Sequence, residues 1–195
     1  YKINRMKGKN MTLDNILEEI KKAKTIAIVV HENPDGDAVG SSLAMKLALK
    51  QLGKEADLII PEFPAEFKFL PGIDEVKKES YIESYDLTIA LDCASIKLLN
   101  GCTKYFENAK TKVVIDHHGS NTMYGDYNYV DQESPACAQL LLIIFNYFGL
   151  EVTKEIGTCI LSGIITDTGG FRYEGVTAET FRFVAELCEK GIKVS

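Results

Sequence analysis

The spacing of apolar residues divides the chain into alternating strands and helices. Short, continuous apolar runs predict strands at residues 25–31, 55–60, 85–92 and 111–116, with a shorter one at 127–130. Apolar residues at helical spacing predict helices at residues 11–24, 38–53, 135–149, 154–169 and 177–191. Thr12 is the expected N-cap of the first helix, and Gly53 is the expected stop of the second. A loop with a short turn is expected at residues 64–72, and a helix-prone segment separates the third strand from the fourth.

Strands that alternate with helices indicate an α/β fold, with a mostly parallel sheet flanked by helices on both faces. In such sheets, ligands bind in the crevice beyond the carboxyl ends of the strands. The residues that directly follow each predicted strand are therefore the first candidates for a functional site.

Composition and charge limit the class of partner. The protein has 195 residues, of which 46% are hydrophobic and 26% are charged, as is typical of a globular domain. Four of the 22 basic residues and none of the 28 acidic residues fall within residues 1–10, so residues 11–195 carry 18 basic against 28 acidic groups. This acidic body lacks the basic footprint of a protein that binds long duplex nucleic acid.

Cysteine usage and hydropathy indicate a cytoplasmic protein without a membrane segment. The five cysteines are odd in number, scattered and never in C-x-x-C spacing, which argues against a disulfide framework or a zinc ribbon. The longest apolar run, residues 140–145, is too short to span a membrane, and no secretory signal pattern opens the chain. Residues 1–10 lack periodicity and precede Met11, so we expect either a vector-derived segment or a disordered tail.

Each of the three histidines lies beside an aspartate at the end of a predicted strand. The polar residues at these ends are His31, Asp35 and Asp37 after the first strand, Asp92 after the third, Asp116, His117 and His118 after the fourth, and Asp167 ahead of a Gly-Gly turn. Any single aspartate has a structural explanation, since Asp37 could cap a helix and Asp92 could cap the segment that follows it. Chance and turn chemistry do not confine every histidine to one edge, so the set as a whole predicts a metal centre.

The types of ligand narrow the choice of metal. Carboxylates and imidazoles without thiolates favour Mn²⁺, with Mg²⁺, Fe²⁺ or Co²⁺ as alternatives. Two histidines and four aspartates are too many for one ion with open positions, and they fit a two-metal site that clamps the oxygens of a phosphoryl group. Two divalent cations would also offset the local negative charge and attract an anionic substrate.

Four motifs carry a resemblance to a known family. The segments HENPDGDAVGS, DCAS, DHH and GIITDTGGF, in this order and spacing, resemble the motifs of the DHH phosphoesterase superfamily. Within it, the chain is most similar to the bifunctional oligoribonuclease and pAp phosphatase (nanoRNase-like) branch, over nearly all of residues 25–190. The resemblance implies a DHH catalytic domain at residues 11–190. Residues 191–195 would then begin a linker to a C-terminal substrate-binding domain that is absent from this chain.

The resemblance also implies two Mn²⁺ ions, for which Mg²⁺ or Co²⁺ are possible substitutes. By this resemblance, His31 and Asp35 bind one ion, Asp37, His117 and Asp167 bind the other, and Asp92 bridges the two ions. These six residues are our expected metal ligands.

Five further residues are candidates for catalysis or for binding phosphate. Asp116 is expected to orient an imidazole, and His118 is expected to contact the scissile phosphate or to be a hydrogen-bonded structural residue, rather than to ligate a metal. Gly40 and Ser41 could offer backbone N–H groups to a phosphate, although close packing explains small residues there equally well. Arg172 is a candidate phosphate clamp, with a surface ion pair as the alternative.

The expected activity is hydrolysis of short oligoribonucleotides or of 3'-phosphoadenosine-5'-phosphate (pAp) through a metal-bridging hydroxide, with Asp92, Asp116 and His118 as catalytic residues. A cyclic-dinucleotide phosphodiesterase and a manganese inorganic pyrophosphatase are the alternatives, since their metal motifs are similar. A non-catalytic metal-binding regulatory module is a third alternative, against which the intact ligand set argues. A homodimer is possible, because the apolar helix that contains residues 140–145 could supply a dimer face as easily as core.

Overall fold

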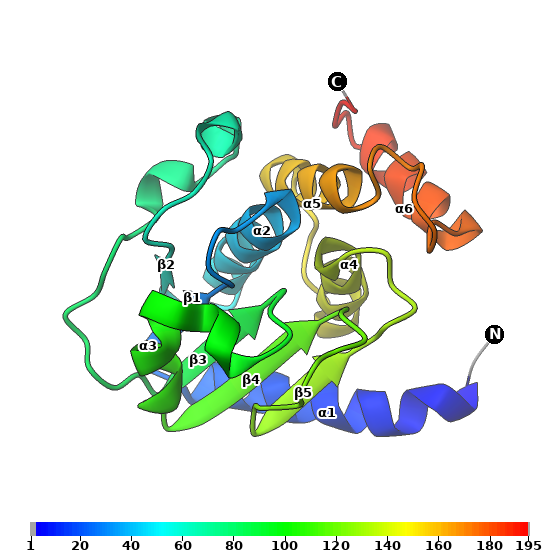
Figure 1. Ribbon diagram of the computed structural model, residues 1–195. Helices are drawn as coiled ribbons and strands as arrows, with labels where there is room; N and C mark the ends of the chain where they lie inside the picture. The colour runs from blue at the N-terminus through cyan, green and yellow to red at the C-terminus, as the bar shows by residue number, and fades with distance from the viewer. Residues whose placement is uncertain (1–2, 195) are drawn as a thin grey trace.

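Five parallel strands form a single sheet at the centre of the molecule (Figure 1). The computed structural model describes the backbone of residues 3–194 and the side chains of residues 11–194, so residues 1–2 of the expected tail and residue 195 of the expected linker lie outside the described part. The strands are β1 (Ile26–Val29), β2 (Ala56–Ile59), β3 (Leu87–Leu91), β4 (Thr111–Asp116) and β5 (Tyr127–Val130). Their order in the sheet is β2-β1-β3-β4-β5, and each neighbouring pair is parallel.

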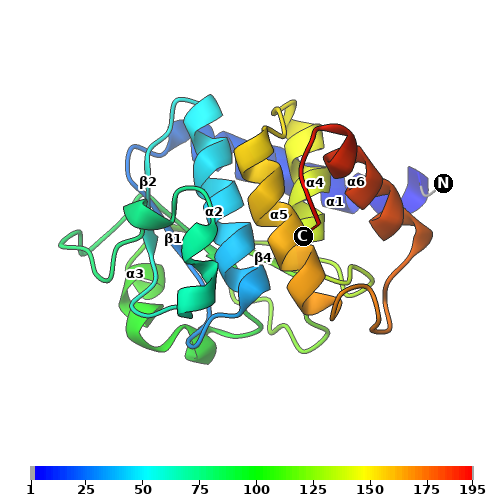
Figure 2. The same ribbon diagram turned by 90° about the horizontal axis from the view of Figure 1, so that it is seen from above.

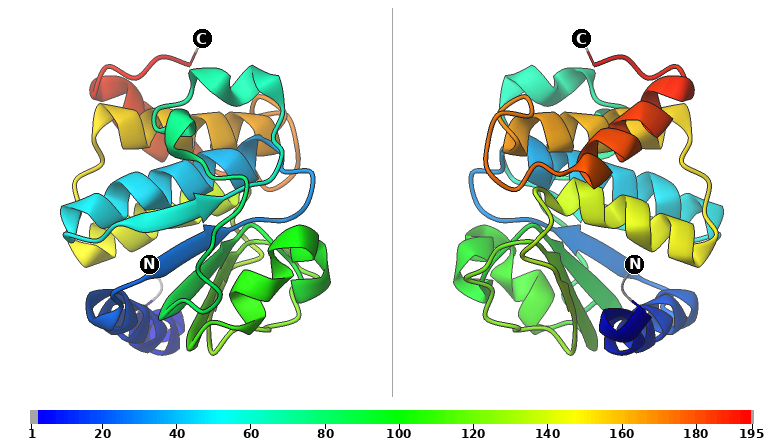
Figure 3. Two further views of the ribbon diagram at one scale, coloured as in Figure 1. Left: turned by 90° about the vertical axis from the view of Figure 1, so that its left-hand side faces the viewer. Right: turned by 90° about the vertical axis from the view of Figure 1, so that its right-hand side faces the viewer.

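Helices cover both faces of this sheet. The helices are α1 (Ile3–Lys22), α2 (Gly36–Gln51), α3 (Thr103–Glu107), α4 (Cys137–Phe148), α5 (Lys154–Asp167) and α6 (Ala178–Glu189). Three short 3₁₀ helices are η1 (Ala65–Phe69), η2 (Ile73–Glu75) and η3 (Ile96–Cys102). Helices α1, α2 and α4 lie on one face, η3 and α3 lie on the other, and α5 packs outside α2 and α4 (Figures 1 and 3). The predicted fold class is confirmed.

The continuous apolar runs of the sequence become strands that are buried on both faces. All residues of β1 and β3 are buried, as is typical of a central strand in a parallel sheet. Ile28 and Ile89 belong to the larger core cluster against α2 and α4, whereas Ala27 and Ala90 belong to the smaller cluster against η3 and α3. Side chains therefore alternate between two hydrophobic cores along each strand.

The apolar helix proposed as either core or dimer face is α4. Its residues Leu140, Leu141, Ile144 and Phe145 are fully buried within the domain. Helix α4 packs against α5 and β4, and the view from above shows α5 between α2 and α4 (Figure 2). These side chains therefore belong to the core and offer no dimer face. Over the described residues, no helix is long and apolar enough to cross a membrane.

Two predicted helix starts were wrong. Helix α1 begins at Ile3 instead of after the expected N-cap Thr12, since no proline interrupts residues 3–12; residues 3–10 are therefore helical, and their origin stays untested. Helix α2 begins at Gly36, and its N-cap is Asp35, whose carboxylate accepts hydrogen bonds from the backbone N–H groups of Asp37 and Ala38. Asp37 is therefore not the cap, and its own carboxylate is left for another partner.

Candidate metal centre

The chain reverses its direction across the sheet between β1 and β3. It passes from β1 to β2 on one side, and then crosses to β3 on the other side of β1. At such a switch point, the loops after the two strands diverge and leave a crevice beyond their carboxyl ends. The β1–α2 loop, the end of β3 and the end of β4 all meet there, and α5 approaches from the layer above (Figure 1).

The structure brings together all six expected metal ligands at this crevice. They fall into two groups in which the possible ligand atoms lie within 4.8 Å of one another: His31, Asp35 and Asp92 form one group, and Asp37, His117 and Asp167 form the other. Asp92 joins the two groups, because its Oδ2 lies 3.8 Å from His31 Nε2 and its Oδ1 lies 3.4 Å from His117 Nε2. In the second group, His117 Nε2 lies 3.2 Å from Asp167 Oδ2 and 3.8 Å from Asp37 Oδ2.

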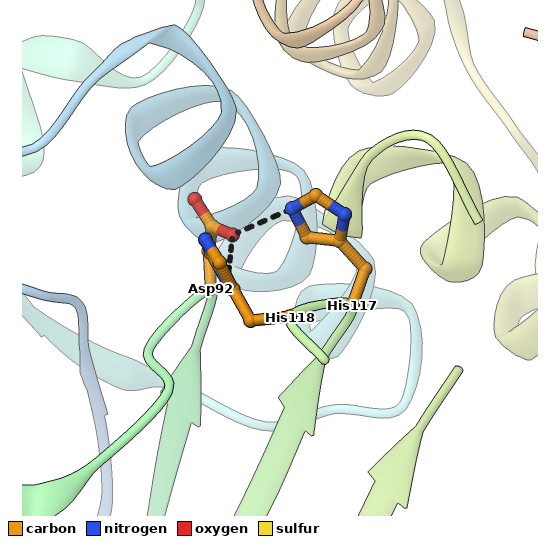
Figure 4. Close-up of side chains that lie close together, drawn as sticks. All are labelled: Asp92, His117 and His118. Carbon is orange, nitrogen blue, oxygen red and sulfur yellow. Dashed lines mark ion pairs between the residues drawn. The ribbon is translucent and has the colours of Figure 1, made fainter. Parts of the chain in front are cut away.

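Asp92 has an unsatisfied carboxylate oxygen at the point where the groups meet. Its side chain is 2% exposed, and its Oδ1 has no hydrogen-bond partner among the described residues. Figure 4 shows the ion pairs that this oxygen makes with the rings of His117 and His118. The backbone of Asp92 has φ +51°, a left-handed conformation that costs energy for a residue other than glycine. A buried carboxylate oxygen without a hydrogen bond is rare in native proteins, and a divalent cation is the partner that the surrounding side chains fit.

The carboxylate of Asp37 is held rigidly inside the fold. It is completely buried, and its two oxygens accept hydrogen bonds from the backbone N–H groups of Cys137 and Ala138 at the start of α4. Burial raises its pKa well above the usual aspartate value, and the negative charges of Asp92 and Asp167 add to that rise against the opposing effect of His117. The positive charge that the chain itself places here therefore does not balance the negative charge of these carboxylates.

Backbone carbonyls fix the two histidines that face the carboxylates. Because a carbonyl can only accept, His31 Nδ1 donates to the Glu32 carbonyl at 2.8 Å, and His117 Nδ1 donates to the Ser134 carbonyl at 3.2 Å. Each ring is left with Nε2 as the nitrogen that can ligate a metal, which is the usual role of such an outer hydrogen bond. Burial opposes protonation of His117, but Asp92, Asp37 and Asp167 outweigh it and raise the pKa of this histidine to about 9.

Asp116 orients His118 and not the neighbouring imidazole ring of His117. Its Oδ1 accepts from His118 Nδ1 at 2.8 Å and from the backbone N–H of His117 at 2.8 Å, and its Oδ2 accepts from Asn121 Nδ2 at 2.6 Å. Burial favours a neutral Asp116, yet the hydrogen bonds from His118 and Asn121 lower its pKa. The same bond raises the pKa of His118. The side chain of His118 is 43% exposed, so its Nε2 edge can face a ligand.

Three of the expected phosphate-binding residues make other contacts in the structure. A Cβ at Gly40 would collide with the backbone oxygen of Cys159, and Ser41 is fully buried with its hydroxyl donating to the Ala38 carbonyl. These contacts support close packing as a reason for small residues at Gly40 and Ser41, and the phosphate role of their backbone N–H groups stays a prediction. Arg172 is exposed after α5, where its Nε donates to the Gly169 carbonyl at 2.6 Å. Among the described residues, no contact joins Arg172 to the six expected ligands.

Two residues that support the site were not predicted from the sequence. Asn121 holds Asp116 through Oδ2, and the carbonyl of Ser134 holds the ring of His117. Asn121 lies in the same loop, three residues after His118. This closeness to the histidine pair is the signal by which it could have been predicted. Ser134 acts through its backbone oxygen, so its residue type gives no such indication.

Glycines let α5 approach α2 closely enough to deliver the last carboxylate. A Cβ at Gly163 would lie 2.7 Å from Asp37 Oδ1 and 2.7 Å from Ala138 Cβ. Asp167 stands one helical turn beyond Gly163 and therefore lies on the same face of α5. The close crossing of α2 and α5 thus sets the position of Asp167 against Asp37 and His117.

The fold and the site define an α/β domain with an acidic, histidine-containing centre for divalent metal at its topological switch point. A model of the DHH family, N-terminal domain, matches residues 25–164, and the chain belongs to this family. The family resemblance drawn from the sequence motifs is confirmed.

Relatives with assigned names match over most of this chain but over only part of their own length. A bifunctional oligoribonuclease and PAP phosphatase, NrnA, from Thermus thermophilus is 37% identical over 92% of this chain and 55% of that protein. A probable manganese-dependent inorganic pyrophosphatase from an Exiguobacterium species is 28% identical over 85% of this chain and 55% of that protein. The crystal structure of an exopolyphosphatase-related protein from Bacteroides fragilis matches with a TM-score of 0.87 and 29% identity, over 94% of this chain and 58% of that chain. The chain thus spans about half the length of the curated relatives it matches.

Proposed function

We propose that the full-length gene product is a two-metal phosphoesterase that hydrolyses short oligoribonucleotides and pAp with Mn²⁺. The observation that carries this proposal is the position of Asp92, whose two oxygens face two separate groups of carboxylate and imidazole ligands. One of these oxygens is buried without a hydrogen-bond partner among the described residues. Asp92 would hold both cations, and this role would account for both features.

Bound cations and the side chains that hold them would have different roles in such a reaction. Bound divalent cations would supply the positive charge that activates water and stabilises a phosphoryl group during displacement. Asp37 and His117 are fixed by the N-terminus of α4 and by the Ser134 carbonyl, so they hold their ligand atoms in place without reorganising. A new bond forms between phosphorus and the oxygen of water, and the bond to the departing oxygen breaks.

His118 is suited to the departing oxygen or to a phosphate oxygen. Its Nδ1 is bound to Asp116, and the raised pKa favours the imidazolium form. The imidazolium can donate a hydrogen bond through Nε2 to a phosphate oxygen and can transfer a proton to the oxygen that leaves. Asp116 and Asn121 keep the ring in this orientation.

The class of substrate rests on charge and on the relatives. The Thermus thermophilus protein is named as an oligoribonuclease and PAP phosphatase, and the acidic body of this chain fits short substrates better than long duplexes. The likeness to a probable manganese-dependent pyrophosphatase keeps pyrophosphate as a second candidate. All six ligands are present and gathered in one place, which favours catalysis over a purely regulatory role.

The test is a hydrolysis panel with Mn²⁺ on the full-length gene product. It includes pAp, di- to pentaribonucleotides, cyclic di-AMP and pyrophosphate, for the wild type and for Asp37→Asn, Asp92→Asn and the control Asp74→Asn. Asp74 is exposed in η2 and belongs to neither ligand group. Because the loss of an outer-shell partner alone costs about 10–100-fold, we expect each ligand substitution to cost more than that and the control to retain activity. Equal activity in all four proteins would refute the site.

A further inference from the structure

A cleft adjoins the metal centre on the side of His31. It has a volume of about 420 Å³ and is bounded by the β1–α2 loop, by the segment that follows β2 and by η3. We call it the His31 cleft, because His31 lines it and also belongs to the first ligand group. Its volume lies within the range of about 300–1,000 Å³ that is usual for small-molecule sites.

The lining of the His31 cleft is apolar at its base and polar at its rim. Ile60, Leu99 and Cys102 are apolar lining residues that are themselves almost fully buried, while the lining residues Asn33 and Asn100 are exposed. Apolar surface together with a few amide groups suits a flat ring that carries hydrogen-bonding edges.

The charge of the His31 cleft disfavours a polyphosphate chain. Glu32 and Glu62 line it with only one lysine, Lys78, so the formal charge of these side chains is negative. A polyphosphate chain that extended from the metal centre would meet net repulsion there. An uncharged sugar and base would not.

The His31 cleft is also held in a fixed shape. The backbone N–H of Glu32 donates to the Leu98 carbonyl at 2.7 Å, which ties the β1–α2 loop to η3 across the cleft. Asn33 has φ +55° and Asn100 has φ +38°. Such left-handed conformations persist where the surrounding structure determines them, and they concentrate at ligand sites. A preformed cleft lowers the cost of ordering a ligand.

We propose that the His31 cleft binds the nucleoside that is attached to the scissile phosphate. His31 borders both the cleft and the metal centre, so a nucleoside seated against it presents its own phosphate to the ligand groups. This inference rests on the proposed phosphoesterase function and adds a nucleoside subsite to it. It also predicts that a nucleotide is preferred over a bare polyphosphate as substrate.

The test fills the His31 cleft at Gly101. A Cβ at Gly101 meets no atom within 4 Å, and Gly101 is not among the glycines with positive φ, so a side chain can be added without strain. We expect the series Gly101→Ala, Gly101→Leu and Gly101→Trp to weaken dinucleotide hydrolysis by the full-length protein with Mn²⁺ in order of side-chain size. For Gly101→Trp, kcat/KM should fall about tenfold or more through a higher KM, which is the mark of lost ground-state binding.

Two controls make the result decisive. Lys97→Trp places the same large side chain on an exposed position of η3 that does not line the cleft, and it should keep wild-type kinetics. Calorimetric titration with adenosine, which carries no phosphate, should show binding to the wild type and to Lys97→Trp, and lost binding in Gly101→Trp. Thermal melting checks that each variant folds.

The two proposals fail in different ways. If Gly101→Trp matches Lys97→Trp in hydrolysis and in adenosine binding, the nucleoside subsite is refuted while the phosphoesterase function stands. If the wild type hydrolyses no phosphoester, the proposed function is refuted, and the adenosine titration alone then decides the role of the cleft.

Discussion

The crossing of α2 and α5 offers a direct test of how the fold positions the metal centre. Gly163→Ala adds one methyl group at the point where α5 passes over Asp37. In the structure, that methyl carbon would stand 2.7 Å from Asp37 Oδ1 and 2.7 Å from Ala138 Cβ. Asp37 cannot retreat, because the backbone N–H groups at the start of α4 hold both of its oxygens. Helix α5 must therefore move away, and Asp167 moves with it.

The size of the effect can be worked from these distances. Carbon atoms pack best at about 3.5–4.0 Å, so α5 must shift by on the order of 1 Å near Gly163. Overpacking of this kind costs about 1–3 kcal/mol, and the better helix propensity of alanine returns about 1 kcal/mol. The net loss of unfolding free energy is then about 0–2 kcal/mol. A misplacement of about 1 Å costs about 10²-fold in rate, so activity should fall far more than stability.

The assay compares Gly163→Ala with Gly157→Ala, which is the same substitution in the same helix. The three atoms nearest to a Cβ at Gly157 belong to the side chains of Ile192 and Leu187 and not to backbone or to a metal ligand, so they can give way by rotation. We expect Gly157→Ala to keep wild-type hydrolysis of a dinucleotide with Mn²⁺, and Gly163→Ala to lose most of it while melting within a few degrees of the control. Activity in Gly163→Ala within twofold of Gly157→Ala would refute the reasoning.

Two further predictions follow from charges. Burial, together with the negative charge of Asp92, raises the pKa of Asp167. The contribution of Asp167 to the stability of the metal-free protein is therefore present at low pH and is lost as pH rises through that pKa. Asp167→Asn should therefore raise the melting temperature of the EDTA-treated protein at pH 8 and reduce the stabilisation by added Mn²⁺; a lower melting temperature would contradict this. Hydrogen bonds from Lys110 and from two backbone N–H groups lower the pKa of Asp86, so its contribution is lost as pH falls below the usual aspartate pKa of about 4. In urea titrations, Asp86→Asn should flatten the acid side of the stability profile, and an unchanged slope would contradict the assignment.

The sequence was sufficient to predict the fold class and the place of the site. Continuous apolar runs predict strands that are buried on both faces, and the alternation of these strands with helices predicts a parallel sheet. Parallel strands end at one edge, so residues that follow different strands, such as Asp92 and His117, are necessarily brought near one another. The structure places them there, with Asp92 Oδ1 at 3.4 Å from His117 Nε2.

Contacts between distant segments could not be predicted in this way. The start of α4 binds the carboxylate of Asp37 across about a hundred residues of chain, and no local pattern encodes this pair. The residue that caps α2 could not be predicted for a related reason. Asp35 and Asp37 are both suitable caps by residue type, and only the packing of α2 against α4 and α5 decides that Asp37 turns inward.

The roles of Asp35 and Asp37 show how one short loop serves stability and chemistry together. Asp35 Oδ1 accepts two backbone N–H groups at the start of α2, and the same carboxylate belongs to the first ligand group. Asp37 accepts two backbone N–H groups at the start of α4 and belongs to the second group. Each carboxylate is therefore oriented by a helix N-terminus, whose positive end stabilises its negative charge. The fold can thus hold these acids oriented and close together before any cation binds, at a cost in stability that a bound metal reverses.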